Sequence, residues 1–268
     1  MIRLVAIDID DTLLLPDRTI SSRVGRAIRA VRDLGCLVVL ATGRMFCAAL
    51  PYAVDLGLKG PLITYQGALL KTADRQLLRH LVIPASVLKP LLQWLESEPV
   101  HINLYVEDQL YVAEMNDVAR RYAAHSRIEV KEVGCLSRLP VEAATKVVAI
   151  GDPVLLAGDL QEQARAKFGR TLAINRSYPH FLEFGHQQAT KSQALAWLGE
   201  TFDIEPAAML AIGDAENDID MLQFAGIGIA MGNASPVVQA VADYIAPSNT
   251  EDGVAIALEK YFNLVSRG

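Results

Sequence analysis

The stretch Leu4-Val5-Ala6-Ile7-Asp8-Ile9-Asp10-Asp11-Thr12-Leu13 decides the fold of this chain. It opens with a short apolar run that contains two β-branched residues and ends abruptly in carboxylates. Such a run predicts a buried strand of a parallel sheet, with Asp8 and Asp10 delivered at its carboxyl end. Because side chains alternate along a strand, carboxylates two residues apart lie on the same side.

The rest of the first third alternates strands with helices. A helix is expected from Ser21 or Ser22 to Gly35, then a strand from Cys36 to Ala41 that ends in Thr42-Gly43-Arg44. A helical stretch to about Leu56 and a strand from Leu62 to Tyr65 follow. Strands and helices alternating over short connections predict a parallel α/β sheet, in which ligands sit at the carboxyl ends of the strands.

The same style returns near the C-terminus. We expect a helix from about Lys191 to Phe202 and a buried strand from Met209 to Ile212 that ends in Gly213-Asp214-Ala215-Glu216-Asn217-Asp218. Short strands are expected at Ile227–Met231 and Asp243–Ile245, before a last helix that reaches about Phe262. The two ends of the chain therefore predict one Rossmann-like α/β core.

The middle of the chain has a different pattern. The segments His101–Val106 and Gln109–Ala113 flank Glu107-Asp108, which predicts a hairpin, and further strands alternate with helices up to Gly185. We therefore expect an inserted α+β domain over residues 83–185, and a discontinuous core domain formed by residues 1–82 and 186–268.

Composition excludes several classes of protein. The chain has 268 residues, of which 51% are hydrophobic and 21% charged, so it is not a disordered chain. A formal charge of −6, with no basic block, argues against nucleic acid and membrane surfaces as partners. There is no signal peptide, no membrane-spanning run and no disulfide framework, which predicts a cytoplasmic protein. Each of the three cysteines, Cys36, Cys47 and Cys135, is expected to be buried.

Polar side chains gather where the predicted strands end. In a parallel sheet these ends face one crevice, which would collect Asp8, Asp10, Thr42, Gly43, Lys191, Asp214, Asn217 and Asp218. Carboxylates placed so close together repel one another and need a counter-ion. Because only oxygen ligands are supplied, that ion is expected to be Mg²⁺ rather than zinc.

This set of residues suits phosphoryl transfer. Mg²⁺ and a lysine neutralise the oxygens of a transferring phosphoryl group, and a hydroxyl with backbone N–H groups orients it. A carboxylate beside the metal can attack phosphorus, and a second can protonate the leaving oxygen and then deprotonate water. We therefore assign Asp8 as the nucleophile, Asp10 as the acid/base and Asp214 as the metal anchor.

Four motifs, in this order, resemble those of the haloacid dehalogenase (HAD) superfamily. They are Asp8-Ile9-Asp10-Asp11-Thr12-Leu13, Ala41-Thr42-Gly43-Arg44, Lys191, and Gly213-Asp214-Ala215-Glu216-Asn217-Asp218. The insert resembles the type C2B cap of subclass IIB. Ala230-Met231-Gly232-Asn233-Ala234 and Ser248-Asn249-Thr250-Glu251-Asp252-Gly253 resemble the Cof-type phosphatases of that subclass.

The resemblance implies a Mg²⁺-dependent phosphatase with the HAD fold. It implies that Asp8 and Asp214 bind the metal through their carboxylates, that Asp10 does so through its backbone carbonyl, and that Asp218 supports the metal. It also implies that the phosphate is held by Thr42, Gly43, Lys191 and Asn217. Arg44 is expected to be a surface residue or to contact the insert.

Several positions depart from the pattern of the resembling family, including Asp11, where Gly is frequent but Asp is also common, and the segment 183–188 before Lys191. Gln66 stands in the loop Tyr65-Gln66-Gly67-Ala68 where Asn is usual, and Ser192 follows Lys191 where Gly is usual. Both lie on the expected substrate side, so they would alter specificity rather than the chemistry.

The expected function is hydrolysis of a small phosphorylated metabolite through an aspartyl-phosphate. The substrate class is a sugar phosphate or a phosphorylated cofactor precursor, and the enzyme would be a monomer or a homodimer. A phosphotransferase or mutase of the phosphomannomutase type remains an alternative. A receiver-like signalling module is a weaker one, because such modules are about half as long and have no inserted domain.

Overall fold

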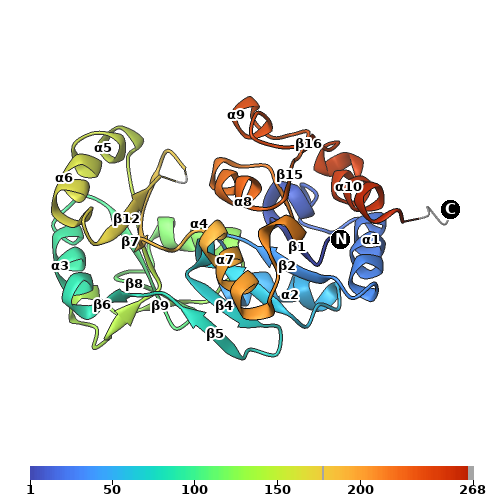
Figure 1. The fold of residues 1–268 in the computed structure, drawn as a ribbon. Helices are drawn as coiled ribbons and strands as arrows, with labels where there is room; N and C mark the ends of the chain where they lie inside the picture. The colour runs from blue at the N-terminus through green and yellow to red at the C-terminus, as the bar shows by residue number, and fades with distance from the viewer. Residues whose placement is uncertain (177, 265–268) are drawn as a thin grey trace. The chain divides into compact units, whose positions relative to one another are not determined.

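The computed structural model describes residues 1–176 and 178–264, which form two compact units (Figure 1). The core unit comprises Met1–Leu78 and Thr190–Gly268, and the inserted unit comprises Arg79–Ala189. The junctions at 78/79 and 189/190 lie close to the predicted domain boundaries, 82/83 and 185/186. Among the described residues, no helix combines the length and the apolar character needed to span a membrane.

The core unit is built on a mixed sheet. Within the described residues the sheet has eight strands in the order β16-β15-β14-β1-β2-β3-β4-β5. β1 pairs in parallel with β14 and β2, and the parallel pairing extends to β3 on one side and to β16 on the other. The strands are β1 (Leu4–Ile7), β2 (Leu37–Ala41), β3 (Pro61–Thr64), β4 (Leu69–Thr72), β5 (Leu77–His80), β14 (Met209–Gly213), β15 (Ile227–Ala230) and β16 (Tyr244–Ile245).

The predicted Rossmann-like α/β core is confirmed, with two further strands, β4 and β5, at the edge of the sheet. β4 runs antiparallel to β3, a pairing that was not predicted from the sequence. All four residues of β1 are buried, as expected for a central strand with helices on both faces.

Helices surround this sheet. Ser21 caps the first helix, because its side chain accepts a hydrogen bond from the backbone N–H of Val24. This helix packs beside the last one (Figure 1). The Arg23 guanidinium contacts the Glu259 carboxylate at 2.7 Å across the pair. The helices are α1 (Ser22–Asp33), α2 (Phe46–Asp55), α7 (Lys191–Phe202), α8 (Ile219–Phe224), α9 (Pro236–Gln239) and α10 (Gly253–Phe262).

The inserted unit carries a six-stranded sheet in the order β12-β13-β11-β7-β8-β9. Its pairs are antiparallel except for β8 with β9. The predicted hairpin is present, and its two turn residues, Glu107 and Asp108, have φ of 50° and 63°, the left-handed values that a tight hairpin turn requires. The strands are β7 (His101–Val106), β8 (Gln109–Val112), β9 (Val130–Glu132), β11 (Lys146–Ile150), β12 (Leu172–Asn175) and β13 (Phe181–His186).

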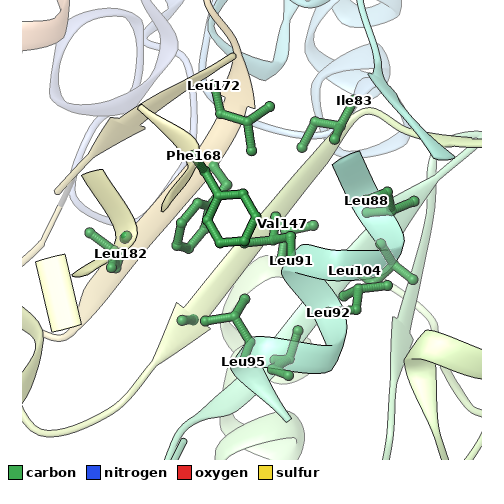
Figure 2. Close-up of a cluster of buried hydrophobic side chains, with 14 of the residues drawn as sticks. Ile83, Leu88, Leu91, Leu92, Leu95, Leu104, Val147, Phe168, Leu172 and Leu182 are labelled. Atoms are coloured by element: carbon green, nitrogen blue, oxygen red, sulfur yellow. The ribbon is translucent and has the colours of Figure 1, made fainter. Parts of the chain in front are cut away.

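One face of this second sheet is covered by helices and forms an apolar core (Figure 2). Leu88, Leu91, Leu92 and Leu95 recur at helical spacing on α3 and point into the same cluster as Phe168 (Figure 2). The helices of this unit are α3 (Ala85–Leu95), α4 (Asp117–Ser126), α5 (Pro153–Ala157) and α6 (Asp159–Phe168), and a small second sheet pairs β6 (Ile83–Pro84) with β10 (Ala143–Ala144). The inserted unit is therefore α+β, as predicted.

Short helical turns complete the chain at Ile9–Leu13, Tyr65–Gly67, Leu136–Arg138, Pro206–Ala208, Glu216–Asp218 and Asn249–Glu251. The prediction for the cysteines was right for Cys36 only, because Cys47 and Cys135 are exposed. Both lie at the start of a helix or a helical turn, where one side of the backbone faces solvent.

Candidate active site

Three carboxylates meet at the carboxyl edge of the core sheet. Asp8 directly follows β1, Asp214 directly follows the neighbouring β14, and Asp218 ends the short turn before α8. One carboxylate oxygen from each lies within 4.8 Å of the others. Parallel pairing of β1 with β14 brings the first two together, because both strands end at the same edge.

A buried lysine joins two of these carboxylates. The Lys191 Nζ lies 2.5 Å from an Asp8 oxygen and 2.6 Å from an Asp218 oxygen. The side chains of Lys191 and Asp218 are fully buried, and that of Asp8 is 8% exposed. Burial alone would lower the pKa of Lys191, but the charges of Asp218 and Asp8 outweigh it and raise that pKa. Lys191 therefore stays a cation inside the protein.

One lysine does not balance the negative charge of the group. Burial raises the pKa of Asp8 well above its usual range, against the opposing attraction of Lys191, and the nearby Asp218 raises it further. Burial also raises the pKa of Asp214 to about 6, although the hydroxyl of Thr12 donates to this carboxylate at 2.7 Å. An additional cation at this group would favour the ionised form of both residues.

Asp218 also shapes the loop after β14. Its second carboxylate oxygen accepts hydrogen bonds from the backbone N–H groups of Asp214 and Ala215, both at 3.1 Å. A Cβ on Gly213 would lie 2.5 Å from the Asp218 Cγ, so only glycine fits at that position. Gly213, at the end of β14, thus leaves room for the buried Asp218 carboxylate to pack against the end of this strand.

The loop after β2 lies on the other side of β1. Thr42 is buried, and its hydroxyl oxygen accepts a hydrogen bond from the backbone N–H of Arg44 at 3.1 Å. A Cβ on Gly43 would lie 2.6 Å from the Gln66 Nε2, so the Gln66 side chain lies directly against the glycine backbone. Gln66 has a φ of 59°, and its backbone N–H donates to the Thr42 carbonyl, which ties the two loops together.

Asp10 lies outside the buried carboxylate group. Its side chain is 53% exposed, and the Arg44 guanidinium contacts both of its oxygens, with an Nε–Oδ2 distance of 2.8 Å. Arg44 in turn donates to the Tyr52 hydroxyl at 3.4 Å, and its guanidinium carbon lies 5.4 Å from the centre of the Tyr52 ring. Burial would lower the pKa of Arg44, but the hydrogen bonds and charge of Asp10 raise it.

Two contacts of the site were not predicted from the sequence. Arg44, expected at the surface or against the insert, is partly buried and forms an ion pair with Asp10. Thr12 was assigned no role, and its hydroxyl donates to the Asp214 carboxylate. Their positions in the motifs, two residues after Thr42 and two after Asp10, were the available signals. Asn217, which was predicted to hold the phosphate, is exposed in the turn Glu216–Asp218.

Two of the departures from the expected pattern differ in their surroundings. Ser192 lies in the first turn of α7, where its backbone N–H and its hydroxyl both donate to the Asp220 carboxylate, at 3.1 Å and 2.6 Å. It therefore joins α7 to α8. The Gln66 Oε1 is buried and has no hydrogen-bond partner among the described residues.

The family model for haloacid dehalogenase-like hydrolases matches residues 5–258, which is nearly the whole chain. The chain belongs to this family. The match covers both halves of the core unit and the inserted unit between them.

Individual relatives agree over almost the full length. The 5-amino-6-(5-phospho-D-ribitylamino)uracil phosphatase YitU of Bacillus subtilis is 30% identical, with 97% of this chain and 98% of that protein covered. A haloacid dehalogenase-like hydrolase from Bacteroides thetaiotaomicron superposes with a TM-score of 0.90 at 28% identity, covering 98% and 100% of the two chains. The HAD subclass IIB sugar phosphatase BT4131 superposes with a TM-score of 0.83 at 25% identity, with the same coverage.

These similarities confirm the predicted superfamily, subclass IIB of the Cof type, and the predicted enzyme class, a phosphatase. HAD hydrolases generally use Mg²⁺, and the buried group of Asp8, Asp214 and Asp218 supplies only oxygen ligands. Such a donor set fits a hard divalent cation.

Proposed function

We propose that this chain hydrolyses small phosphomonoesters through a phosphoryl group carried on Asp8. The observation that carries the proposal is the buried Asp8 carboxylate, held 2.5 Å from the Lys191 ammonium within a group of three carboxylates. A carboxylate at a strand end, beside a fixed cation and away from bulk water, is suited to attack phosphorus.

The first step forms a bond between an Asp8 oxygen and phosphorus and breaks the bond from phosphorus to the ester oxygen. The Lys191 Nζ, the Thr42 hydroxyl, the Gly43 N–H and the Asn217 amide are proposed to hold the phosphoryl oxygens. Lys191, at the start of α7, and Thr42, just after β2, are both buried, which favours electrostatic stabilisation because little water screens them.

Asp10 is proposed to transfer the protons. It protonates the departing ester oxygen in the first step. In the second step it takes a proton from the water that attacks phosphorus, and the bond from phosphorus to Asp8 breaks. The exposure of the Asp10 side chain suits both proton transfers, because the leaving group departs toward solvent and the attacking water arrives from solvent.

Mg²⁺ is the proposed cofactor. Asp8 and Asp214 would hold it through their carboxylates and Asp10 through its backbone carbonyl, with Asp218 in support. The ion would neutralise phosphoryl oxygens and the excess negative charge of the site. The three carboxylate oxygens within 4.8 Å of one another support this assignment, because Lys191 alone leaves the group with an excess of negative charge.

The proposed substrates are small organic phosphates, either a sugar phosphate or a phosphorylated cofactor precursor. Two similar proteins support this class: one is named for a phosphorylated ribitylaminouracil and the other is a sugar phosphatase. At 25–30% identity these names support a substrate class rather than one compound.

The decisive experiment compares Asp8→Asn with Asp11→Asn. Asp11 is an exposed carboxylate in the same turn with a φ of 55°, which Asn tolerates well, so it is a matched control. With Mg²⁺ and p-nitrophenyl phosphate, Asp8→Asn should release no phosphate, whereas Asp11→Asn should retain activity. Mass spectrometry of acid-quenched wild-type protein should find a phosphoryl group on the peptide that contains Asp8.

Two results would contradict this function. Full activity of Asp8→Asn would remove Asp8 as the nucleophile. Transfer of the phosphoryl group only to a second sugar, with no release of phosphate to water, would make the enzyme a phosphotransferase instead of a hydrolase.

A further inference from the structure

Two asparagines from distant loops contact the backbone just after the proposed catalytic aspartates. The Asn233 Nδ2 donates to the Asp11 carbonyl at 2.8 Å, and the Asn249 Nδ2 donates to the Leu14 carbonyl at 2.8 Å. The two residues are also joined, because the Asn233 Oδ1 accepts a hydrogen bond from the backbone N–H of Asn249 at 3.0 Å. We call Asn233 and Asn249 the asparagine bridge.

The loops that carry the bridge are held tightly by their own packing. A Cβ on Gly232 would lie 2.9 Å from the Ala246 carbonyl, and one on Gly253 would lie 2.0 Å from the Pro247 carbonyl. The backbone N–H of Gly253 also donates to the Ser248 carbonyl at 3.1 Å. Because such close backbone contacts leave little freedom to shift, the bridge presents its two amide groups from a rigid base.

The segment that the bridge holds has an unusual backbone. Asp10 is extended, with a ψ of 131°, and the next residue, Asp11, is left-handed, with a φ of 55°. These two angles set the direction of the Asp10 carbonyl. The following residue, Thr12, donates its hydroxyl to the Asp214 carboxylate at 2.7 Å. The conformation of residues 10–12 thus controls two groups at the carboxylate site.

A left-handed conformation is uncommon for a residue other than glycine, although aspartate adopts it more readily than most. The hydrogen bond at the Asp11 carbonyl fixes the peptide group that leads into Thr12, the one at the Leu14 carbonyl fixes the chain two residues after Thr12, and both come from outside the segment. Without them, residues 10–12 could rotate, and both the Asp10 carbonyl and the Thr12 hydroxyl would move.

We infer that the asparagine bridge positions the metal site. Asn233 and Asn249 act through the backbone of residues 10–14 and touch neither substrate nor metal. This inference rests on the proposed function, in which the Asp10 carbonyl and the Asp214 carboxylate are metal ligands. Groups that orient metal ligands typically change metal affinity more than they change the chemistry.

The test uses the whole 268-residue chain and four variants: Asn233→Ala, Asn233→Asp, Gln239→Ala and Asp214→Ala. Asn233→Ala loses both contacts of its side chain, whereas Asn233→Asp keeps the acceptor for the Asn249 N–H and replaces the donor to Asp11 by an acceptor oxygen that the Asp11 carbonyl repels. The added negative charge of Asn233→Asp would attract a Mg²⁺ ion rather than repel it, so weaker metal binding in this variant would follow from release of the Asp11 backbone. Gln239→Ala is the matched control, because Gln239 bonds the Gly232 and Ala234 carbonyls on either side of Asn233 and does not reach residue 11.

Two quantities are measured with Mg²⁺ alone as the probe: the rise in melting temperature as Mg²⁺ is added, and the Mg²⁺ concentration that gives half-maximal activity. In both Asn233 variants the apparent Mg²⁺ affinity should fall about tenfold, the low end for loss of a group that orients metal ligands. Saturating Mg²⁺ should restore most of kcat. In Gln239→Ala the affinity should stay within about twofold, as for an ordinary surface change.

The outcomes separate this inference from the proposed function. If Mg²⁺ stabilises wild type and Asn233→Asp at the same concentrations, the bridge does not position the site. A merely structural role would lower the melting temperature without Mg²⁺ and leave the Mg²⁺ affinity unchanged, which also overturns the inference. In wild type, Mg²⁺ should raise the melting temperature, and Asp214→Ala should abolish this rise. If either result is not observed, the proposed metal site itself fails.

Discussion

The two units of the chain bury polar groups in different ways. Among the described residues of the core unit, two charged side chains are fully buried, those of Lys191 and Asp218. In the inserted unit the buried polar side chains of the described residues are neutral, Asn103 and Thr145. Burying a charge costs several kcal/mol unless it is paired and hydrogen-bonded, so enclosed charges indicate a site whose chemistry requires them.

The arrangement of strands explains where each unit places its polar residues. In the core unit, parallel strands end at one edge, so the residues after β1 and β14 meet there. In the inserted unit, polar residues alternate along a single strand instead: His101, Asn103 and Tyr105 lie two apart on β7 and are linked by hydrogen bonds of 3.0 Å and 3.4 Å. One unit thus concentrates charge at a point, and the other spreads neutral polar groups over a face.

The largest expected effect tests the buried charge of the core unit. Lys191→Met should destabilise the Mg²⁺-free protein by about 4 kcal/mol, because it leaves Asp8 and Asp218 buried without their cation. Urea unfolding in EDTA measures this loss. Turnover of p-nitrophenyl phosphate should also disappear.

Lys146→Met in the inserted unit is the comparison for this variant. Lys146 pairs with Glu183, but both side chains retain some exposure, 14% and 15%, so the loss should be smaller. Adding Asp218→Asn to Lys191→Met should recover part of the stability by removing one unpaired charge. Equal losses in the two lysine variants would show that leaving the buried carboxylates of the core unit without their cation is no more destabilising than unpairing the partly exposed Glu183.

The next effect tests the apolar core of the inserted unit. Leu91 is fully buried on α3, so Leu91→Ala should cost about 3 kcal/mol, within the usual range for this substitution. Lys89→Ala on the exposed side of the same helix should cost less than about 0.5 kcal/mol. The Mg²⁺ concentration for half-maximal activity should be the same in both variants. A shift in Leu91→Ala alone would show that the metal site depends on the packing of the inserted unit.

The sequence predicted the parts of the site that follow from the backbone. An apolar run that ends in an acid specifies both a buried strand and the edge at which it ends, so Asp8 and Asp214 could be placed together before the structure was known. Lys191 could be placed near them because the first residues of a helix in this fold lie at the same edge. Their roles in catalysis remain predictions.

Contacts that depend on side-chain direction could not be predicted in this way. The pairing of Arg44 with Asp10 depends on how the loop after β2 turns, and the pattern of apolar residues carries no information about that turn. In the asparagine bridge, Asn233 lies 222 positions after Asp11, and Asn249 lies 235 positions after Leu14. Only the folded loops bring the members of each pair together. The exposure of Cys47 and Cys135 was also missed, because a tendency toward burial is an average and not a rule for one position.

A smaller effect is expected in the pH dependence of the stability of the core unit. Burial raises the pKa of Asp214 to about 6, so the folded protein holds this proton more tightly than the unfolded chain does. The contribution of Asp214 to the free energy of unfolding is therefore fully present below the usual carboxyl pKa and is lost as the pH rises through about 6. In EDTA, Asp214→Asn should therefore gain stability relative to wild type when the pH rises from about 5 to about 7.5.

Melting temperatures of both proteins at the two pH values measure this difference. At the proposed metal site, Mg²⁺ would compete with the same proton, so its stabilising effect on wild type should be weaker at the lower pH. If Asp214→Asn tracked wild type across this range, the carboxyl of Asp214 would not carry the shifted pKa.

The smallest expected effect compares the two aspartates of one motif. Asp8 is buried against Lys191, whereas the Asp10 side chain is 53% exposed and pairs with Arg44. Because solvent screens a half-exposed pair, the Arg44–Asp10 interaction should contribute less than about 1 kcal/mol to stability. A double-mutant cycle with Arg44→Ala and Asp10→Asn, followed by urea unfolding, measures it, and Tyr52→Phe controls for loss of the hydroxyl that holds Arg44. An interaction energy as large as that of the Lys191 contacts would mean that Asp10 belongs to the buried charge cluster, and its proposed exchange of protons at the solvent side would then be wrong.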